Sequence, residues 1–255
     1  MTQLLCPRMG SYIAGRVRTG HRAWLPLSRS KSTLTIVKPS GSASRYAPTP
    51  IVFLAVKPFA DASSNNPAPN PRDAQSLWSS WISQATTHGY ESMLLDVDPE
   101  ELHTSSPPAP TKVLDLLERE MVTQLRSASA FPPILFARGC DSVAAEQYAS
   151  SHGLSALFLL DPATSFAEAR GSGGPKVLRG DEEGKGFEFD FEPRFACRVA
   201  WSQARLQADG EEARLHRIEE ELIEEEEQEG RIVWENADRQ GPEEMRAWLE
   251  DECGL

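Results

Sequence analysis

Short apolar segments alternate with helix-forming segments along most of the chain, and this alternation constrains the fold more than any other feature. The helical segments have apolar residues at helical spacing, such as Leu114, Leu117, Met121 and Leu125. The apolar segments are rich in β-prone residues and nearly uninterrupted, which is typical of strands buried on both faces. There are six of them, at 51–56, 92–96, 134–137, 156–160, 196–201 and 232–234. We therefore predict an α/β fold with a mostly parallel central sheet and helices on both faces.

The amino-terminal segment has the composition of a targeting sequence. Residues 1–60 contain nine basic residues and no acidic residue, since the first acid is Asp61. An arginine-rich, serine-rich and acid-free segment is typical of a mitochondrial transit peptide. We predict that residues 1–46 are a transit peptide or a disordered arm, with cleavage between Ser30 and Ala47. Residues 47–255 would then form one domain, located in the mitochondrial matrix.

The charge and the cysteines exclude several classes of protein. All 38 acidic residues but only 17 of the 26 basic residues follow position 60, and a surface that acidic repels nucleic acid. No apolar run approaches the ~18 residues of a membrane span. The four cysteines lie far apart and form no CxxC pair, and the sequence has no metal-binding histidine motif and no phosphate-binding glycine loop. We therefore predict neither nucleic acid, membrane, metal nor cofactor as a partner.

The stretch PPILFARGCDSVAAEQYASSHGLSALFLLDPA, residues 132–163, reads as a buried strand, a tight turn, a helix and a second buried strand. With its turn ARGCD (137–141), it resembles the nucleophile elbow of the α/β hydrolases. Residues 76–99 are similar to that family's first helix and next strand, and residues 230–252 to its last strand, histidine loop and final helix. The resemblance covers about residues 50–255 and implies an α/β-hydrolase-type fold, with the lid reduced to a flexible polar insertion at 164–193.

The chain departs from the family at the positions that would carry catalysis. Gly139 occupies the elbow apex, where the family has its serine, and no histidine occurs in the expected loop at 236–241. The loop after the first strand reads VKPF (56–59) instead of His-Gly, which alters the oxyanion-hole element. Asp209 stands where the resemblance places the acid of the triad. We infer a degenerate member without a Ser-His-acid triad, whose elbow consists of Arg138, Gly139, Cys140 and Asp141.

Two residues beside the apex leave a hydrolase activity open. Ser142 lies in the first turn of the following helix, where a serine more often supports the helix terminus than attacks a substrate. Cys140 lies near a helix amino terminus beside Arg138, a setting that activates a thiol. We predict a non-catalytic protein that binds a partner or a small ligand, with a diverged hydrolase or esterase using Ser142 or Cys140 as the alternative.

The stretch from Glu211 to Glu229 contains ten glutamates, and one helical face of it carries Leu215, Ile218 and Leu222. We predict a helix that covers the sheet and exposes an acidic face to solvent. The alternative is an acidic interaction module that binds a basic mitochondrial protein.

Other polar side chains are predicted to have ordinary roles. Asp96 and Asp161 each end a strand at the edge where α/β sheets bind ligands. His88 and His152 lie in last helical turns, where an imidazolium interacts favourably with the helix dipole. We expect His216, in the acidic helical run, to lie away from the elbow.

Overall fold

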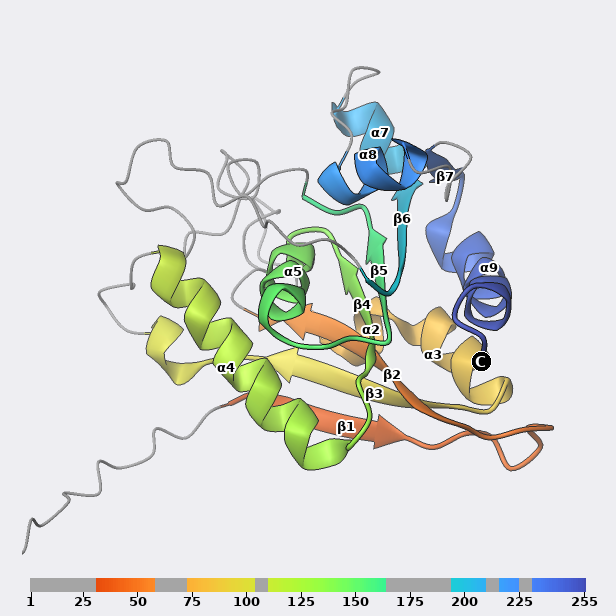
Figure 1. Ribbon diagram of the computed structural model, residues 1–255, viewed down its shortest axis with the longest axis horizontal. Coiled ribbons are helices and arrows are strands. Elements are labelled where there is room, and N and C mark those ends of the chain that lie inside the picture. The colour runs from red at the N-terminus through yellow and green to blue at the C-terminus, as the bar shows by residue number, and fades with distance from the viewer. Residues whose placement is uncertain (1–30, 58–72, 104–109, 164–193, 210–215, 225–230) are drawn as a thin grey trace, which may run out of the picture.

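The computed structural model describes residues 31–57, 73–103, 110–163, 194–209, 216–224 and 231–255. Seven strands form one sheet in the order β1-β3-β2-β4-β5-β6-β7 (Figure 1). β1 runs antiparallel to β3, and all other neighbouring strands are parallel. The strands are β1 (Thr33–Val37), β2 (Ala47–Val56), β3 (Tyr90–Val97), β4 (Ile134–Arg138), β5 (Ala156–Leu160), β6 (Ala196–Ser202) and β7 (Ile232–Trp234). The predicted α/β class is confirmed, and each of the six apolar segments is a strand.

Helices cover both faces of this sheet (Figure 1). One face packs against α4 (Pro110–Ala128), α5 (Asp141–Ser151) and α8 (Arg217–Glu224). The other packs against α2 (Ala74–Leu77), α3 (Ser79–Thr87) and α9 (Ala237–Asp251). The short helices η1 (Glu100–His103) and α7 (Gln203–Asp209) follow β3 and β6. Because side chains alternate along a strand, β2 contributes Val52 and Leu54 to the first core and Ile51 and Phe53 to the second.

The core beneath α3 and α9 is strongly aromatic. The Phe136 and Phe158 rings stack with centroids 4.9 Å apart, and the Trp81 and Trp234 ring centroids are 5.9 Å apart. A Cβ atom on Gly241 of α9 would lie only 2.3 Å from Cζ2 of Trp81. The absence of a side chain at position 241 therefore allows α9 to approach α3 closely.

The sheet begins earlier in the chain than the sequence indicated, so the predicted domain boundary at residue 46 is wrong. β1 lies inside the 1–46 segment and pairs with β3 over five residues, from Thr33 opposite Asp96 to Val37 opposite Ser92. Arg45 donates to Glu250 of α9 at 2.7 Å. The basic, serine-rich composition of this segment predicts a leader, whereas β1 is an edge strand in which only Leu34 and Val37 are partly buried. Residues 1–30 and the insertion at 164–193 lie outside the described residues.

None of the helices in the described part of the chain combines the length and the apolar character needed to cross a bilayer.

Candidate functional site at the carboxyl edge of the sheet

The chain turns sharply where β4, a central strand of the sheet, ends. Arg138 closes the strand, Gly139 follows with φ of 60°, and α5 begins at Asp141. The Gly139 N–H donates to the carbonyl of Leu160 at 2.9 Å, which holds the turn against the end of β5. The tight strand–turn–helix predicted from the sequence is therefore present, with Gly139 at its apex.

Gly139 suits the apex because its backbone lies in the left-handed region. A residue with a Cβ atom is strained at φ of 60°, whereas glycine adopts this conformation at little cost. A Cβ atom built on Gly139 would meet nothing within 4 Å, so the space above the apex is open. The apex has room for a small side chain, but glycine supplies no nucleophilic group there.

The two candidate nucleophiles beside the apex differ in their surroundings. Ser142 is fully buried, and its hydroxyl oxygen accepts the N–H of Ala163 at 3.2 Å, which ties α5 to the segment after β5. Cys140 is half-buried at the N-cap of α5, makes no side-chain capping bond and packs against the core under α4 and α5. Asp141 is buried in the first turn of α5. The surroundings of Ser142 give it a structural role.

Arg138 lies between two carboxylates. Its Nε is 3.7 Å from Oδ2 of Asp161, and its Nη1 donates to Oδ1 of Asp238 in α9 at 3.1 Å. Asp161 follows β5, so three separate elements meet at the carboxyl edge of the sheet. The guanidinium charge is balanced by two acids, which makes this edge unsuited to binding an anion through Arg138.

Asp161 has an unusual backbone, with φ of 51°, and is the one residue other than glycine with a positive φ in the described chain. Its Oδ1 accepts the N–H of Ser202 at 2.6 Å, and its Oδ2 accepts the Ser202 hydroxyl at 3.0 Å. Ser202 also accepts the N–H of Arg205 at 3.2 Å. These bonds connect the ends of β5 and β6, and they compensate the strain at Asp161.

The three imidazoles whose side chains are described contact partners other than a nucleophile at the apex. His88 lies 3.2 Å from Nε2 of Gln84, and His152 lies 3.0 Å from Oε1 of Glu118 in α4. His216 is buried just before α8, with its Nε2 3.2 Å from Oε1 of Glu146 in α5. His152 was predicted to interact with the helix dipole, and it also contacts a carboxylate. His216 contacts Glu146 in the middle of α5.

Position 236–241 is not the loop that the resemblance implied. Asn236 is the N-cap of α9, and its side chain accepts the N–H of Arg239 at 3.1 Å. Residues 237–241 are therefore the first turns of a helix. Asp209, the expected acid, is the last residue of α7, and its side chain lies outside the described residues.

The helix α8 packs Ile218 and Leu222 into the core and exposes Glu220 and Glu224, as predicted, but one of its glutamates is buried. Glu219 is fully buried and accepts the indole N–H of Trp201 at 3.1 Å, the Nε–H of Arg231 at 3.1 Å and the backbone N–H of His216 at 3.2 Å. The Arg231 guanidinium also lies 5.1 Å from the centroid of the Trp201 ring. We call Glu219, Trp201, Arg231 and His216 the α8 cluster. Most of the other glutamates between 211 and 229 lie outside the described residues.

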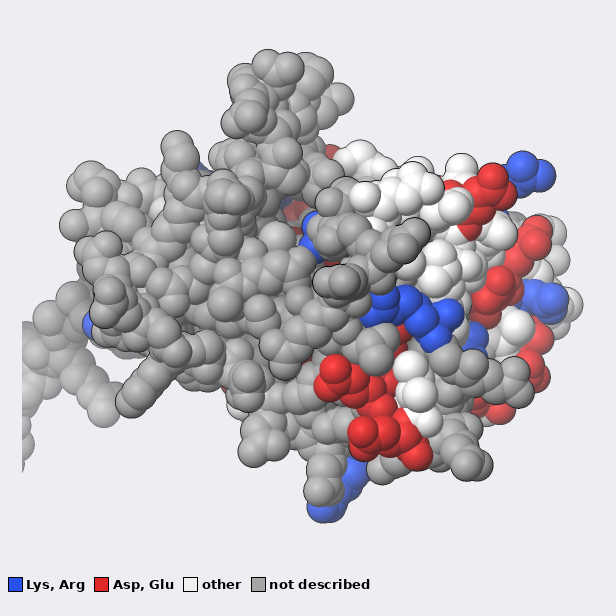
Figure 2. Space-filling model, turned by 90° about the horizontal axis from the view of Figure 1, so that it is seen from above, with Lys and Arg blue, Asp and Glu red and all other residues white. Residues whose placement is uncertain are grey.

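Acidic and basic side chains are intermixed on the described part of the face in Figure 2. Red and blue groups lie next to one another there. This part of the surface does not present a field of one sign.

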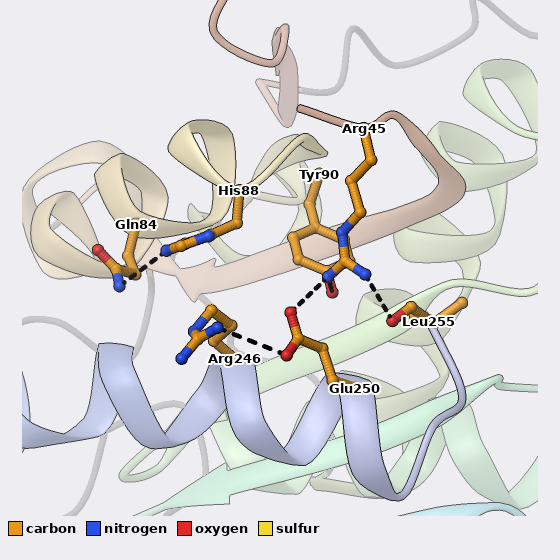
Figure 3. A network of polar contacts seen from close by, with 7 residues as sticks. All are labelled: Arg45, Gln84, His88, Tyr90, Arg246, Glu250 and Leu255. Carbon is orange, nitrogen blue, oxygen red and sulfur yellow. Dashed lines mark hydrogen bonds and ion pairs between the residues drawn. The ribbon is translucent and has the colours of Figure 1, made fainter. Parts of the chain in front are cut away.

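A second polar network lies at the opposite, amino edge of the sheet, where α3 and α9 meet (Figure 3). Arg45 donates to the hydroxyl of Tyr90 and, through Nη1, to the carbonyl oxygen of Leu255 at 3.1 Å. Burial raises the pKa of Tyr90, and the neighbouring Arg45 opposes that rise. The contacts link the segment before β2 to the carboxyl-terminal helix, which is a structural role.

Sequence reasoning identified Arg138, Gly139 and Asp161 but missed their partners Ser202 and Asp238. Arg138, Asp161 and Ser202 each stand at the end of a parallel strand, and such ends meet at one edge of a sheet. That signal was available for Ser202. Asp238 carries no such signal, because its position depends on how α9 packs.

No group of three or more His, Cys, Asp or Glu residues within the described ranges is arranged to hold a metal ion.

Comparison with known proteins gives structural similarities only, since no family model and no curated protein matches the sequence. The structure of MenH from S. aureus has 14% identity and a TM-score of 0.33, with 52% of this chain and 43% of that chain covered. The chain therefore spans less than half the length of that protein. A sugar hydrolase (YeeB) from Lactococcus lactis has 13% identity and a TM-score of 0.40, covering 80% of this chain and 81% of that chain.

Proposed function

We propose that this chain is an α/β-hydrolase-type protein that has lost its catalytic triad and works by binding a partner. The observation that supports this most directly is Gly139 at the apex of the turn after β4, with its left-handed backbone and open space above it. The backbone has the geometry that the family uses to present a nucleophile, and the nucleophile is missing.

The surroundings of the apex support a non-catalytic role. Acyl transfer by the standard route needs a nucleophile, an imidazole in hydrogen-bonding reach and an acid that orients it. Ser142 is fully buried, and its hydroxyl oxygen accepts the N–H of Ala163. Arg138 is paired with Asp161 and Asp238. Ser202 does contact a carboxylate, but that carboxylate, Asp161, is already held by two bonds from Ser202 and by Arg138.

The direct test is labelling of the purified protein with a fluorophosphonate probe, together with hydrolysis of a panel of short acyl esters. We expect no stoichiometric labelling and no turnover above that of heat-denatured protein. Ser142→Ala and Cys140→Ala serve as controls. A diverged hydrolase that uses Ser142 would lose its labelling in the first variant, and one that uses Cys140 would lose its ester hydrolysis in the second. Labelling or turnover of the unmodified chain that disappears in one of these variants would contradict the proposal.

A second experiment asks whether the apex alone limits catalysis. Gly139→Ser restores a hydroxyl, and Gly139→Ala has the same backbone strain without one. We expect neither variant to react with the probe, because no described imidazole lies beside the apex. Labelling of the serine variant alone would show that a base is in place.

We further propose that the protein is imported into the mitochondrial matrix and that its partner is basic. The acid-free composition of residues 1–30 supports import. The ten glutamates between 211 and 229 support a cationic partner, because opposite charges steer association. A synthetic basic amphipathic peptide should bind at low salt and dissociate at high salt, and neutralising Glu224–Glu227 with glutamine should weaken binding. Binding that is unchanged by salt and by these substitutions would exclude the acidic segment as the docking surface.

A further inference from the structure

β1 forms one border of the sheet and has a neighbour on one side only among the described strands (Figure 1). Its five residues pair with β3 in a continuous register with no bulge. An edge strand presents a row of backbone N–H and C=O groups that can pair with another strand. Natural edges are usually protected by charged residues, prolines or bulges within the strand, and β1 has none of these between Thr33 and Val37.

We propose that β1 is a homodimer interface, in which the β1 strands of two copies pair antiparallel and join their sheets into one. This inference concerns assembly and does not depend on the proposed function.

The register of this pairing follows from backbone geometry. In an antiparallel pair, opposed residues must both direct their N–H and C=O groups toward the partner or both away from it. These directions alternate along a strand, so a strand that pairs with its own copy has its two-fold axis at a residue and not between two residues. Pairing of all five residues of β1 places this axis at Thr35, which then lies opposite itself.

The side chains of β1 match themselves in that register. Thr33 lies opposite Val37 of the second copy, and Leu34 lies opposite Ile36. Ile36 is 46% exposed, although Leu34 on the same face packs against the core under α4 and α5. Leu34 of the second copy would cover Ile36 of the first. By the two-fold symmetry, Leu34 of the first copy would cover Ile36 of the second.

No charge repulsion opposes a second copy in this register. The five strand residues are uncharged, and the nearest lysines, Lys31 and Lys38, flank the strand. Lys31 would face Pro39 of the second copy and Lys38 would face Ser32, so no lysine opposes a lysine. The flanking residues therefore limit the pairing to β1 without repelling the second copy.

The oligomeric state of the full chain tests the proposal by sedimentation at increasing concentration. We expect a dimer, and we expect Ile36→Lys to be monomeric because it places a charge in the centre of the interface. Val233→Lys is the matched control, since Val233 is 44% exposed on β7 at the opposite edge of the sheet. A monomeric chain, or a dimer that Ile36→Lys leaves intact, would overturn the proposal.

Cysteine substitution tests the register. Opposed Cα atoms lie about 4.5–5.5 Å apart across an antiparallel pair, which is within disulfide range. Thr35→Cys should therefore form a cross-linked dimer under mild oxidation. Thr33→Cys is equally an exposed position of β1, but its two copies would be about 14 Å apart along the strand. Equal cross-linking of both variants, or of neither, would contradict this register and the interface derived from it.

Discussion

At the scale of single residues, glycine determines how closely two helices approach. Gly241 of α9 packs against the Trp81 ring of α3, and an added Cβ atom would lie 2.3 Å from Cζ2 and 2.5 Å from Cη2 of that ring. The indole is fully buried and has no room to move away. The close packing of α3 against α9 therefore requires a residue without a Cβ atom at position 241.

Gly241→Ala should lower the free energy of unfolding by about 1–3 kcal/mol, because overpacking a core forces its neighbours to shift. Alanine also favours a helix by about 1 kcal/mol over glycine, which offsets only part of this cost. Urea denaturation measures the difference. Gly153→Ala is the matched control, because a Cβ atom at 153 meets nothing within 4 Å. Equal stability of the two variants would contradict the close approach of α3 and α9.

Cys253 shows how burial controls reactivity. Burial, with a smaller contribution from Glu252, raises the pKa of its thiol from 9.0 to about 12. Because the thiolate, not the thiol, attacks the carbon of iodoacetamide and displaces iodide, we expect Cys253 to react slowly at pH 8 in the folded chain and rapidly in guanidinium chloride. Peptide mass spectrometry of both samples measures this, and equal rates would show that the thiol is accessible and ionised.

The same shift gives the sign of a pH effect. The folded pKa of Cys253 lies above the unfolded value, so the folded state retains its proton where the unfolded state has lost it. The stabilisation is complete below about pH 9 and is lost as the pH rises toward 12. Burial raises the pKa values of Tyr90 and Tyr148 as well, which adds to the loss at alkaline pH.

At the scale of an element, α8 owes its position to buried charge as much as to its apolar face. Ile218 and Leu222 pack against the sheet, and Glu219 between them is fully buried with three donors directed at it. His216 contributes a second link, because its Nδ1 accepts the N–H of Ile218 and its Nε2 lies 3.2 Å from Oε1 of Glu146. The Glu219 carboxylate connects α8 to Trp201 of β6, and the Glu146 carboxylate connects His216 to α5.

Glu219→Ala should destabilise the fold by about 3 kcal/mol, because it leaves the Arg231 charge and the Trp201 indole without a common acceptor in a buried site. Glu220→Ala is the control on the same helix, since Glu220 is exposed, and it should change stability by less than about 0.5 kcal/mol. Chemical denaturation followed by tryptophan fluorescence compares them. If both variants cost the same, the α8 cluster is not a stabilising contact.

The elements differ in how far the sequence predicts them. The central strands were predictable because a strand buried on both faces has a nearly unbroken apolar run, as Val52–Val56 and the residues of β5 do. β1 was missed because only Leu34 and Val37 of its five residues are partly covered, so its pattern lacks that run. Glu219 could not be distinguished by composition from the nine other glutamates nearby, because its burial depends on contacts with Trp201 and Arg231, which lie 18 and 12 positions away.

The site was predictable in its backbone and less so in its contacts. The turn at Gly139 follows from local rules for strands, glycine and helix starts. The links from Arg138 to Asp238 and from Asp161 to Ser202 join residues 100 and 41 positions apart. No local pattern specifies such pairs. The loop that the resemblance implied at 236–241 is wrong, because Asn236 caps α9 and the residues after it already belong to that helix.

At the scale of the whole molecule, the amino-terminal boundary can be tested. A chain that begins at residue 31 retains β1 and Arg45, whereas a chain that begins at residue 47 loses β1, the Arg45–Glu250 ion pair and the contact with Leu255. We expect the first to unfold at the denaturant midpoint of the full chain and the second at a clearly lower one. If import removes a leader, mass spectrometry of the mature protein should find its first residue at or before Thr33. Equal stability of both truncated chains would show that β1 contributes nothing.

The antiparallel first strand has a consequence for biosynthesis. Thr33 leaves the ribosome, or any translocation pore that works from the amino end, 63 residues before its partner Asp96. During that interval the strand has no place in the growing sheet, and its backbone groups are available to any extended chain nearby. A chaperone that binds extended segments would find its earliest target there, and a nascent chain stalled before Tyr90 would display that target permanently.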